Sequence, residues 1–386
     1  MRIKSIDIFR ALTMLLMIFV NDLWSLSGIP DWLGHTEAGE DGMGLADVVF
    51  PAFLFIVGLS IPYAIKARIN MGESVIKILK HIAERTIALL VMGFFMVNLE
   101  FINENQMILS RYFWEILMAV TFFLIWNDYR SGRIGRTPVN VMRITGLSIL
   151  VFLAVIYHGH SDNHSQWMRI HWWGILGLIS WGYLVNALVY LLLRDRPGWI
   201  ALVFLVFYLM NINEFISLIP IRFKIVVSAS NHASVMGGLL VTTILMWLKE
   251  KDRMKHLIPV LSGLTVLLLI FGFVSRPLWG ISKIRATPSW TSVCTGINYA
   301  VFIFLYLLAD KMKITRWANV ISPAGKSALT CYLVPYFVYP LLALTGFNLP
   351  EIFLTGLIGI IKSIVFSLLI IWITGLLLKL NVRLKL

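Results

Sequence analysis

Long apolar runs alternate with short polar connections along the whole chain. A helix needs about 17–25 mostly apolar residues to cross a lipid bilayer, and most of the runs are of that order. We therefore predict about twelve membrane helices, within a range of 10–12 because one run is short and another is long. The runs cover residues 8–26, 46–65, 82–99, 112–126, 144–158, 172–193, 199–212, 233–248, 257–274, 291–309, 325–346 and 354–379.

The composition agrees with this pattern. Hydrophobic residues make up 59% of the 386 positions and charged residues only 14%, and the mean hydropathy is +0.82. These values exclude an ordinary soluble domain, so we expect an all-α integral membrane protein. No polar domain or long linker interrupts the runs, and the chain is expected to fold as one transmembrane domain over residues 1–386.

The basic residues predict an orientation. If the N-terminus is cytoplasmic, 24 of the 33 Lys and Arg residues fall in cytoplasmic connections, 7 fall in outer ones, and Lys326 and Lys362 lie within predicted spans. This bias is typical of membrane proteins and places both termini in the cytoplasm. It also accounts for the net charge of +13, so no nucleic-acid partner is expected.

The sequence gives little indication of a metal-binding or nucleotide-binding site. Cys294 and Cys331 lie in predicted spans without metal-ligand spacing, and the chain lacks the G-x-x-x-x-G-K-[ST] pattern of ATP-driven pumps. The segment 157–171 holds His158, His160, Asp162, His164 and His171. Their irregular spacing favours a solvated loop over a metal site. A third interpretation is a surface for an acceptor sugar, with Trp167 and the adjacent Trp172 and Trp173 as stacking platforms.

The stretch from residue 21 to 51 carries the strongest candidate chemistry. Asn21 lies near the outer end of the first apolar run, His35 lies in a Gly- and Pro-containing connection, and Asp47 lies at the start of the second run. A histidine can transfer protons near neutral pH, an asparagine amide can stabilise an oxyanion, and a carboxylate can orient the imidazole. The alternative is structural, with Asn21 and Asp47 capping helices and His35 solvated.

The same stretch resembles the membrane core of the heparan-α-glucosaminide N-acetyltransferase family, within the transmembrane acyltransferase superfamily. That family has a Ser-x-Asp-x-x-Arg-Gly segment, a Met-x-x-Val-Asn, a loop His and a Gly-x-x-x-Ala-Asp-x-Val-Phe-Pro. The residues on that pattern are Ser5, Asp7, Arg10, Met17, Val20, Asn21, His35, Gly42, Ala46, Asp47, Val49, Phe50 and Pro51. Fainter resemblance continues through residues 171–184, 281–290 and 323–333.

The resemblance implies an acetyl transfer from cytoplasmic acetyl-CoA to an amino sugar across the membrane, with His35 and Asn21 as the catalytic pair. This chain departs from the family at Ala11 and in the segments 114–118 and 231–238. Those departures concern the acceptor sugar and contacts with acyl-CoA. The sequence resembles a bacterial-type branch without the additional luminal domain of the lysosomal enzyme.

Our leading hypothesis is therefore an acetyl-CoA-dependent transferase in the bacterial cytoplasmic membrane, with its catalytic loop facing the periplasm and an amino sugar or glycan as acceptor. His35 would act as a general base or as a transiently acylated nucleophile, Asn21 would stabilise the tetrahedral intermediate, and Asp47 would support the site. Basic groups near Arg10, Lys66 or Arg85 would contact the phosphates of the donor. A homodimer is left open.

The rival hypothesis is a carrier for a small sugar or acid, because twelve spans and broken helices also suit transporters. Ionisable residues in the middle of predicted spans are few, which disfavours it. Glu115 is the clearest of them, and we expect it to pair with Lys326 or Lys362 or to stay neutral.

Overall fold

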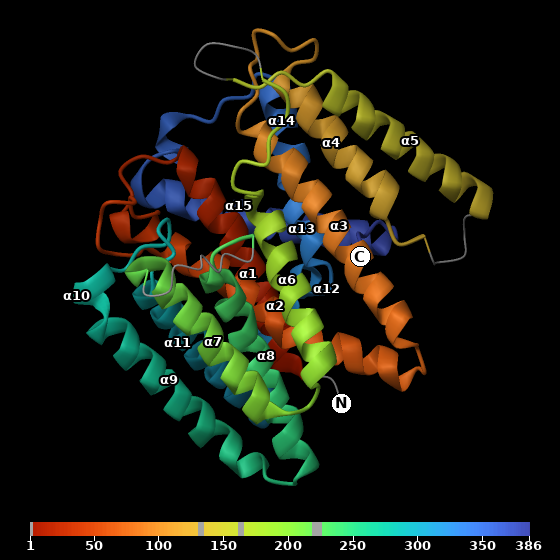
Figure 1. Ribbon diagram of the computed structural model, residues 1–386. Coiled ribbons are helices and arrows are strands. Elements are labelled where there is room, and N and C mark those ends of the chain that lie inside the picture. Colours follow the sequence, from red (N-terminus) through yellow and green to blue (C-terminus); the bar gives the residue numbers. More distant parts are fainter. Residues whose placement is uncertain (1–2, 130–134, 161–165, 218–225) are drawn as a thin grey trace.

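The computed structural model describes residues 3–129, 135–160, 166–217 and 226–386, and within these ranges the chain is all-helical (Figure 1). Each predicted apolar run coincides with helical structure. The main helices are α1 (Lys4–Asp22), α2 (Leu45–Asn70), α3 (Val75–Leu99), α4 (Arg111–Trp126), α5 (Arg136–Val155), α6 (Gly174–Leu193), α7 (Pro197–Ile216), α8 (Ala229–Glu250), α9 (Leu257–Val274), α11 (Pro288–Leu305) and α15 (Gly356–Lys379).

The predicted fold class, an all-α polytopic membrane bundle, is confirmed. Within the described residues, nine helices are long and apolar enough to cross a bilayer. The helix α4 has only 16 residues, and α1 carries four charged side chains along its 19 residues. The exact number of spans therefore stays a prediction.

The bundle is built around α2, which packs against α1, α6, α8 and α11. The pair α4 and α5 forms one edge of the molecule, and α9 runs along α11 at the opposite edge (Figure 1). Only 17% of the apolar window of α5 and 28% of that of α9 are buried. Apolar surface left exposed at both edges is what lipid contact requires.

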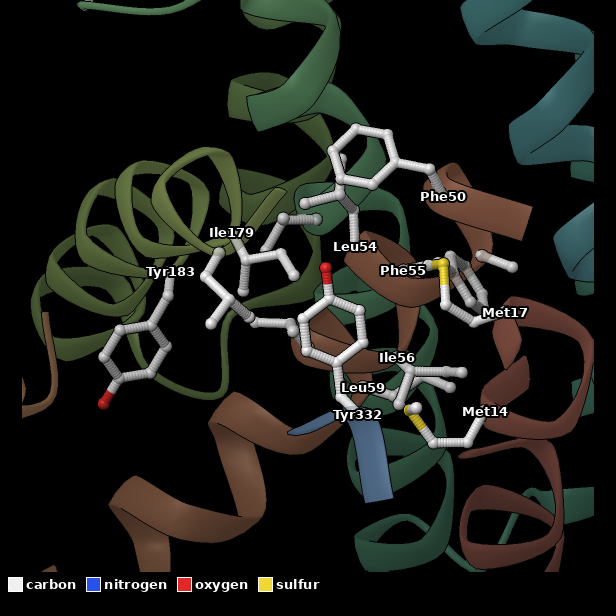
Figure 2. Packing of buried hydrophobic residues seen from close by; sticks show 14 of the residues in the cluster. Met14, Met17, Phe50, Leu54, Phe55, Ile56, Leu59, Ile179, Tyr183 and Tyr332 are labelled. Atoms are coloured by element: carbon white, nitrogen blue, oxygen red, sulfur yellow. The ribbon is translucent and has the colours of Figure 1, made fainter. Parts of the chain in front are cut away.

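The closest helix contact joins α2 to α8 through two glycines. A Cβ atom on Gly58 would lie 1.8 Å from the carbonyl oxygen of Val235, and one on Gly238 would lie 1.9 Å from that of Phe55. Small residues let membrane helices approach closely enough for their backbones to pack. Large side chains fill the adjoining core between α1, α2 and α6, including Met14, Leu54 and Ile179 (Figure 2).

The predicted span over 325–346 is not continuous, because it is broken near its start, while Ala328–Leu344 remains an apolar helical stretch. This region forms three short helices, α12 (Ser322–Lys326), α13 (Ala328–Leu333) and α14 (Pro335–Leu344). Ser327 has φ −144° and ψ 65°, which no helix accommodates, and Pro335 lacks the N–H that a continuous helix would use. The first break lets Gly325 approach α1, where the Arg10 side chain donates to its carbonyl oxygen at 3.3 Å.

Contacts between connections agree with the predicted alternation of sides. At one end of the bundle, Lys66 Nζ lies 2.9 Å from both Asp195 and Glu250, which were predicted on the same side. At the other end, Asp41 pairs with Arg276 at 2.8 Å. Which end faces the cytoplasm stays a prediction.

The contact of α2 with α8 generates a stability prediction. Gly58→Ala should destabilise the protein by about 1–3 kcal/mol, because a methyl group there forces the two backbones apart. Thermal unfolding in detergent measures the change. The matched control is Gly263→Ala in α9, where a Cβ atom meets nothing within 4 Å. Equal melting temperatures for Gly58→Ala and the wild type would show that the backbones of α2 and α8 do not pack closely at Gly58.

Candidate active site

The connection between α1 and α2 is shaped by the start of α2. Gly44 is the residue before the first helical turn, and a Cβ atom there would lie 2.1 Å from the carbonyl oxygen of Gly34, so only glycine fits. Asp47, in the first turn, accepts hydrogen bonds at Oδ2 from the backbone N–H groups of Gly44 and Thr36, both at 3.0 Å. One carboxylate thus caps its own helix and fixes the loop next to His35.

His35 contacts the other oxygen of the same carboxylate. His35 Nδ1 lies 2.7 Å from Asp47 Oδ1. The Asp47 side chain is 1% exposed, whereas that of His35 is 54% exposed. An ionised Asp47 can only accept, so Nδ1 carries the hydrogen and Nε2 is left with a lone pair. This arrangement gives His35 the tautomer of a general base.

A third group, Lys283, lies against this pair. Its Nζ is 3.2 Å from His35 Nδ1 and 3.8 Å from Asp47 Oδ1. Lys283 belongs to the connection between α10 (Arg276–Trp279) and α11. Burial lowers the pKa of its ammonium group, and the charge of Asp47 acts in the opposite direction.

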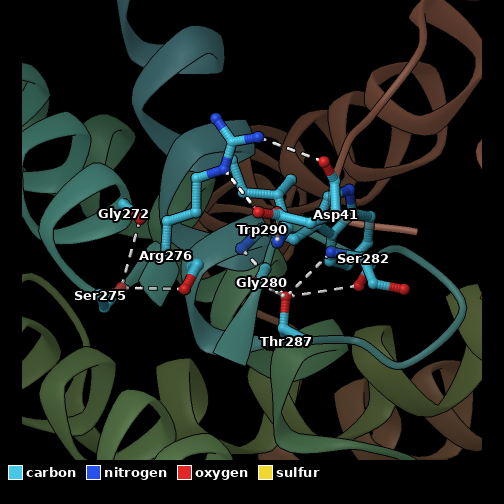
Figure 3. A network of polar contacts seen from close by, with 10 residues as sticks. Asp41, Gly272, Ser275, Arg276, Gly280, Ser282, Thr287 and Trp290 are labelled. Carbon is cyan, nitrogen blue, oxygen red and sulfur yellow. Dashed lines mark hydrogen bonds and ion pairs between the residues drawn. The ribbon is translucent and has the colours of Figure 1, made fainter. Parts of the chain in front are cut away.

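Hydrogen bonds attach the Lys283 loop to the His35 loop (Figure 3). Asp41 accepts from the backbone N–H of Ile281 at 2.7 Å and from Arg276 Nε at 2.8 Å. The Thr287 hydroxyl donates to the Gly280 carbonyl at 2.9 Å and accepts from the N–H of Ser282 at 3.1 Å. The N–H of Ile281 and the Arg276 guanidinium together lower the pKa of Asp41.

His35, Asn21 and Lys283 line one cavity of about 810 Å³, the outer cavity. Asp47 does not line it but contacts His35, which does. The rest of the wall includes Glu100 just after α3, His171, Trp172 and Trp173 in the connection before α6, Asn231 in α8 and Trp290 in α11. The buried indole N–H of Trp290 finds no acceptor within the described part of the chain.

A second cavity of about 310 Å³, the inner cavity, lies toward the predicted cytoplasmic end and is basic. Arg10, Arg85, Lys326 and Lys385 line it. The guanidinium of Arg85 stacks on Tyr183 at 4.5 Å, while its buried Nε has no acceptor among the described residues. A donor left without an acceptor in a basic cavity suits an anionic ligand.

The two cavities share two wall residues, Met17 and Ile175. Met17 lies in the core packed between α1, α2 and α6 (Figure 2). The basic cavity and the cavity of His35 and Asn21 therefore adjoin at these two apolar side chains.

Comparison with known proteins places the chain in a family. A family model described as a domain of unknown function, DUF5009, matches residues 2–267. The chain belongs to the DUF5009 family. The match includes Asn21, His35, Asp47 and the basic residues Arg10 and Arg85, and it ends before Lys283.

This DUF5009 protein is also similar to enzymes over a shorter stretch. It is 36% identical over 97 residues to heparan-alpha-glucosaminide N-acetyltransferase of Homo sapiens and 35% identical over 97 residues to that of Mus musculus. Each match covers 25% of this chain and 14% of the relative. These matches support the expected relationship to an acyltransferase-like family.

The structure brings together some of the residues singled out from the sequence. His35 and Asp47 are in contact, and Asn21 lines the same cavity as His35. Arg10 and Arg85 share the inner cavity. Lys66 does not lie with them, because it lines a different cavity and is held by two carboxylates.

The sequence analysis also made predictions about the partner of Glu115 and about the histidine-rich segment 157–171. Lys362 pairs with Asp22 at 2.6 Å rather than with Glu115. Asp162 and His164 lie outside the described residues, and His171 stacks on Phe101 with ring centroids 3.9 Å apart. Among the residues that the structure describes, no group of three or more His, Cys, Asp or Glu side chains could hold a metal ion.

Lys283 and the basic pair Lys326 and Lys385 were not singled out as site residues. Lys283 follows Ile281 and Ser282 in the segment 281–290, which resembles the family, and this resemblance is the signal in the sequence that points to it. Its contact with His35 spans 248 positions of sequence. Local pattern therefore gave no reason to pair them.

The link between the two loops generates a second prediction. Asp41→Ala should increase amide hydrogen exchange across residues 276–287 by roughly tenfold, because two hydrogen bonds to this carboxylate are lost. The neighbouring exposed Glu40→Ala is the matched control, and exchange mass spectrometry is the measurement.

The lowered pKa of Asp41 gives this effect a pH dependence. The link is fully present above the ordinary carboxyl pKa of 3.8 and is lost as the pH falls through the lowered value of the folded protein. Wild type and Asp41→Ala should thus differ at neutral pH and converge only in strong acid. Identical exchange at neutral pH would contradict the link.

Proposed function

We propose that this protein is a membrane-embedded acyltransferase that moves an acetyl group from cytoplasmic acetyl-CoA to an amino sugar or glycan on the outer side of the membrane. The observation that carries the proposal is the pair of cavities that meet at Met17 and Ile175. One holds basic groups suited to phosphates, and the other holds an imidazole and an amide suited to acyl transfer. The similar human and mouse proteins are N-acetyltransferases by name, which agrees with this assignment.

The donor would bind from the inner cavity. Arg10 and Arg85 are the predicted contacts for the phosphates of acetyl-CoA, and Lys326 and Lys385 add positive charge at the same wall. Arg10 is already oriented by a 2.7 Å hydrogen bond to the Ser60 hydroxyl. Lys66 is left out of this proposal because Asp195 and Glu250 balance its charge.

The chemistry would take place in the outer cavity. The acceptor amine attacks the thioester carbon, the C–S bond breaks, and the products are an amide and the CoA thiol. His35 Nε2 accepts the proton of the amine, since Nδ1 is engaged with Asp47. The amide of Asn21 donates to the oxyanion of the tetrahedral intermediate.

The walls of the outer cavity suit an amino sugar. Trp172 and Trp173 offer flat apolar faces, and Glu100 offers a negative charge to a protonated amine. We assign the outer cavity to the periplasmic side of a bacterial inner membrane, on the basis of the basic residues in the connections.

Transfer of labelled acetyl from acetyl-CoA to glucosamine, or to a panel of amino sugars and glycans, tests the proposal in purified protein. His35→Ala should lower the rate by about 100-fold or more, because the general base is lost. Asn21→Ala should lower kcat by about 100-fold and change KM for acetyl-CoA little. Asn21→Ala should keep the melting temperature of the wild type, whereas His35→Ala, which removes a partner of the buried Asp47, should lower it without unfolding the protein.

A contrasting variant separates donor binding from chemistry. Arg85→Ala should raise KM for acetyl-CoA and leave kcat near the wild-type value, as expected when only ground-state binding is lost. Absence of transfer to every acceptor by the wild type would overturn the proposed function.

Sidedness is tested by labelling single cysteines. In a background with Cys294 and Cys331 replaced, both of which are buried, Glu37→Cys should react with a membrane-impermeant maleimide added to intact cells. The matched control, Lys251→Cys in the connection between α8 and α9, should react only after the membrane is opened. The reverse pattern would refute transfer from the cytoplasm outward.

A further inference from the structure

Lys283 is the charged group of the site that the proposed chemistry does not use. Its Nζ lies 3.2 Å from His35 Nδ1, and its side chain is 26% exposed. Asp47, the carboxylate that both groups face, is 1% exposed. Two cations would therefore compete for one buried carboxylate if His35 were protonated.

Hydrogen-bond geometry limits what Lys283 can do. A neutral Nδ1 either carries a hydrogen or accepts one, so it cannot donate to Asp47 and accept from Lys283 at once. The contact with Asp47, at 2.7 Å, is the shorter of the two. Lys283 therefore acts on the ring through its charge and not as a hydrogen-bond donor to it.

The charge opposes the effect of Asp47. A buried carboxylate beside an imidazole favours the imidazolium form, and a base that is already protonated cannot accept the proton of an amine. An ammonium group at 3.2 Å from the same ring disfavours that form.

We propose that Lys283 is a positioning residue that keeps His35 in its neutral form and leaves the carboxylate of Asp47 to orient the ring. This inference rests on the proposed function of His35 as a base. It extends the site to a loop beyond the residues that the family model matches.

The other ionisable groups near His35 do not place a positive charge against its ring, as Lys283 does. Glu100 and His171 also line the outer cavity. In the loop of His35 itself, Glu37 and Glu40 are exposed, and Asp41 is paired with Arg276. Behind Asp47, the buried thiol of Cys294 faces the backbone carbonyl of that residue at 4.0 Å. Arg285, in the Lys283 loop, lies over the ring of Phe215.

Modification of His35 by diethyl pyrocarbonate tests the proposal without any acyl transfer, because only a neutral imidazole reacts. The extent of modification is followed against pH by mass spectrometry of the peptide that contains His35. Lys283→Met should move the pH midpoint upward by about one unit or more, whereas Lys283→Arg should keep it near the wild-type value. Arg285→Met, which removes a cation from the same loop, is the matched control and should not move it.

Activity gives the second measurement. In Lys283→Met, the acid limb of the pH profile of kcat/KM for acetyl transfer should move to higher pH by the same amount. In Lys283→Arg it should stay near the wild-type position. An unchanged midpoint in Lys283→Met, or equal shifts in the Met and Arg variants, would overturn the proposal. A shifted midpoint in a protein that transfers no acyl group would support Lys283 and reject the proposed function alone.

Discussion

The site depends on one buried carboxylate at the start of a membrane helix. A charge in such a position is costly unless it is satisfied, and Asp47 is satisfied on every side. Two backbone N–H groups, the imidazole of His35 and the ammonium of Lys283 surround it. These partners come from three separate parts of the chain, so satisfying one residue assembles the loop between α1 and α2, the start of α2 and the loop before α11.

The two cavities, at opposite ends of the bundle, differ in the side chains that line them. Positive charge gathers in the inner cavity, and groups able to transfer a proton or stabilise an oxyanion gather in the outer one. The broken helix α12–α14 contributes Gly325, Lys326 and Tyr332 to the inner wall. Irregular backbone is tolerated in a membrane protein where it lines a cavity and not lipid.

The sequence pattern predicted the helices well because a segment that crosses lipid must be both apolar and helical. The pattern did not predict the break within residues 325–346. A mean hydropathy does not register the effect of a single Ser327 or Pro335 on the backbone. Asn21, His35 and Asp47 stood out because each is polar in apolar or loop surroundings. Lys283 and the partners of Lys66 did not, since charge balance between distant connections is a property of packing and not of local sequence.

The wall that Met17 and Ile175 form between the cavities also has an electrical consequence. In an energised membrane, most of the potential falls across the driest layer that separates two aqueous regions, and Met17 and Ile175 are the side chains that line both cavities here. Thioether and hydrocarbon groups neither bind protons nor hold a chain of water molecules. Two apolar side chains shared by both cavities therefore oppose a continuous water path between them, and a hydroxyl or carboxyl group at either position would weaken that barrier.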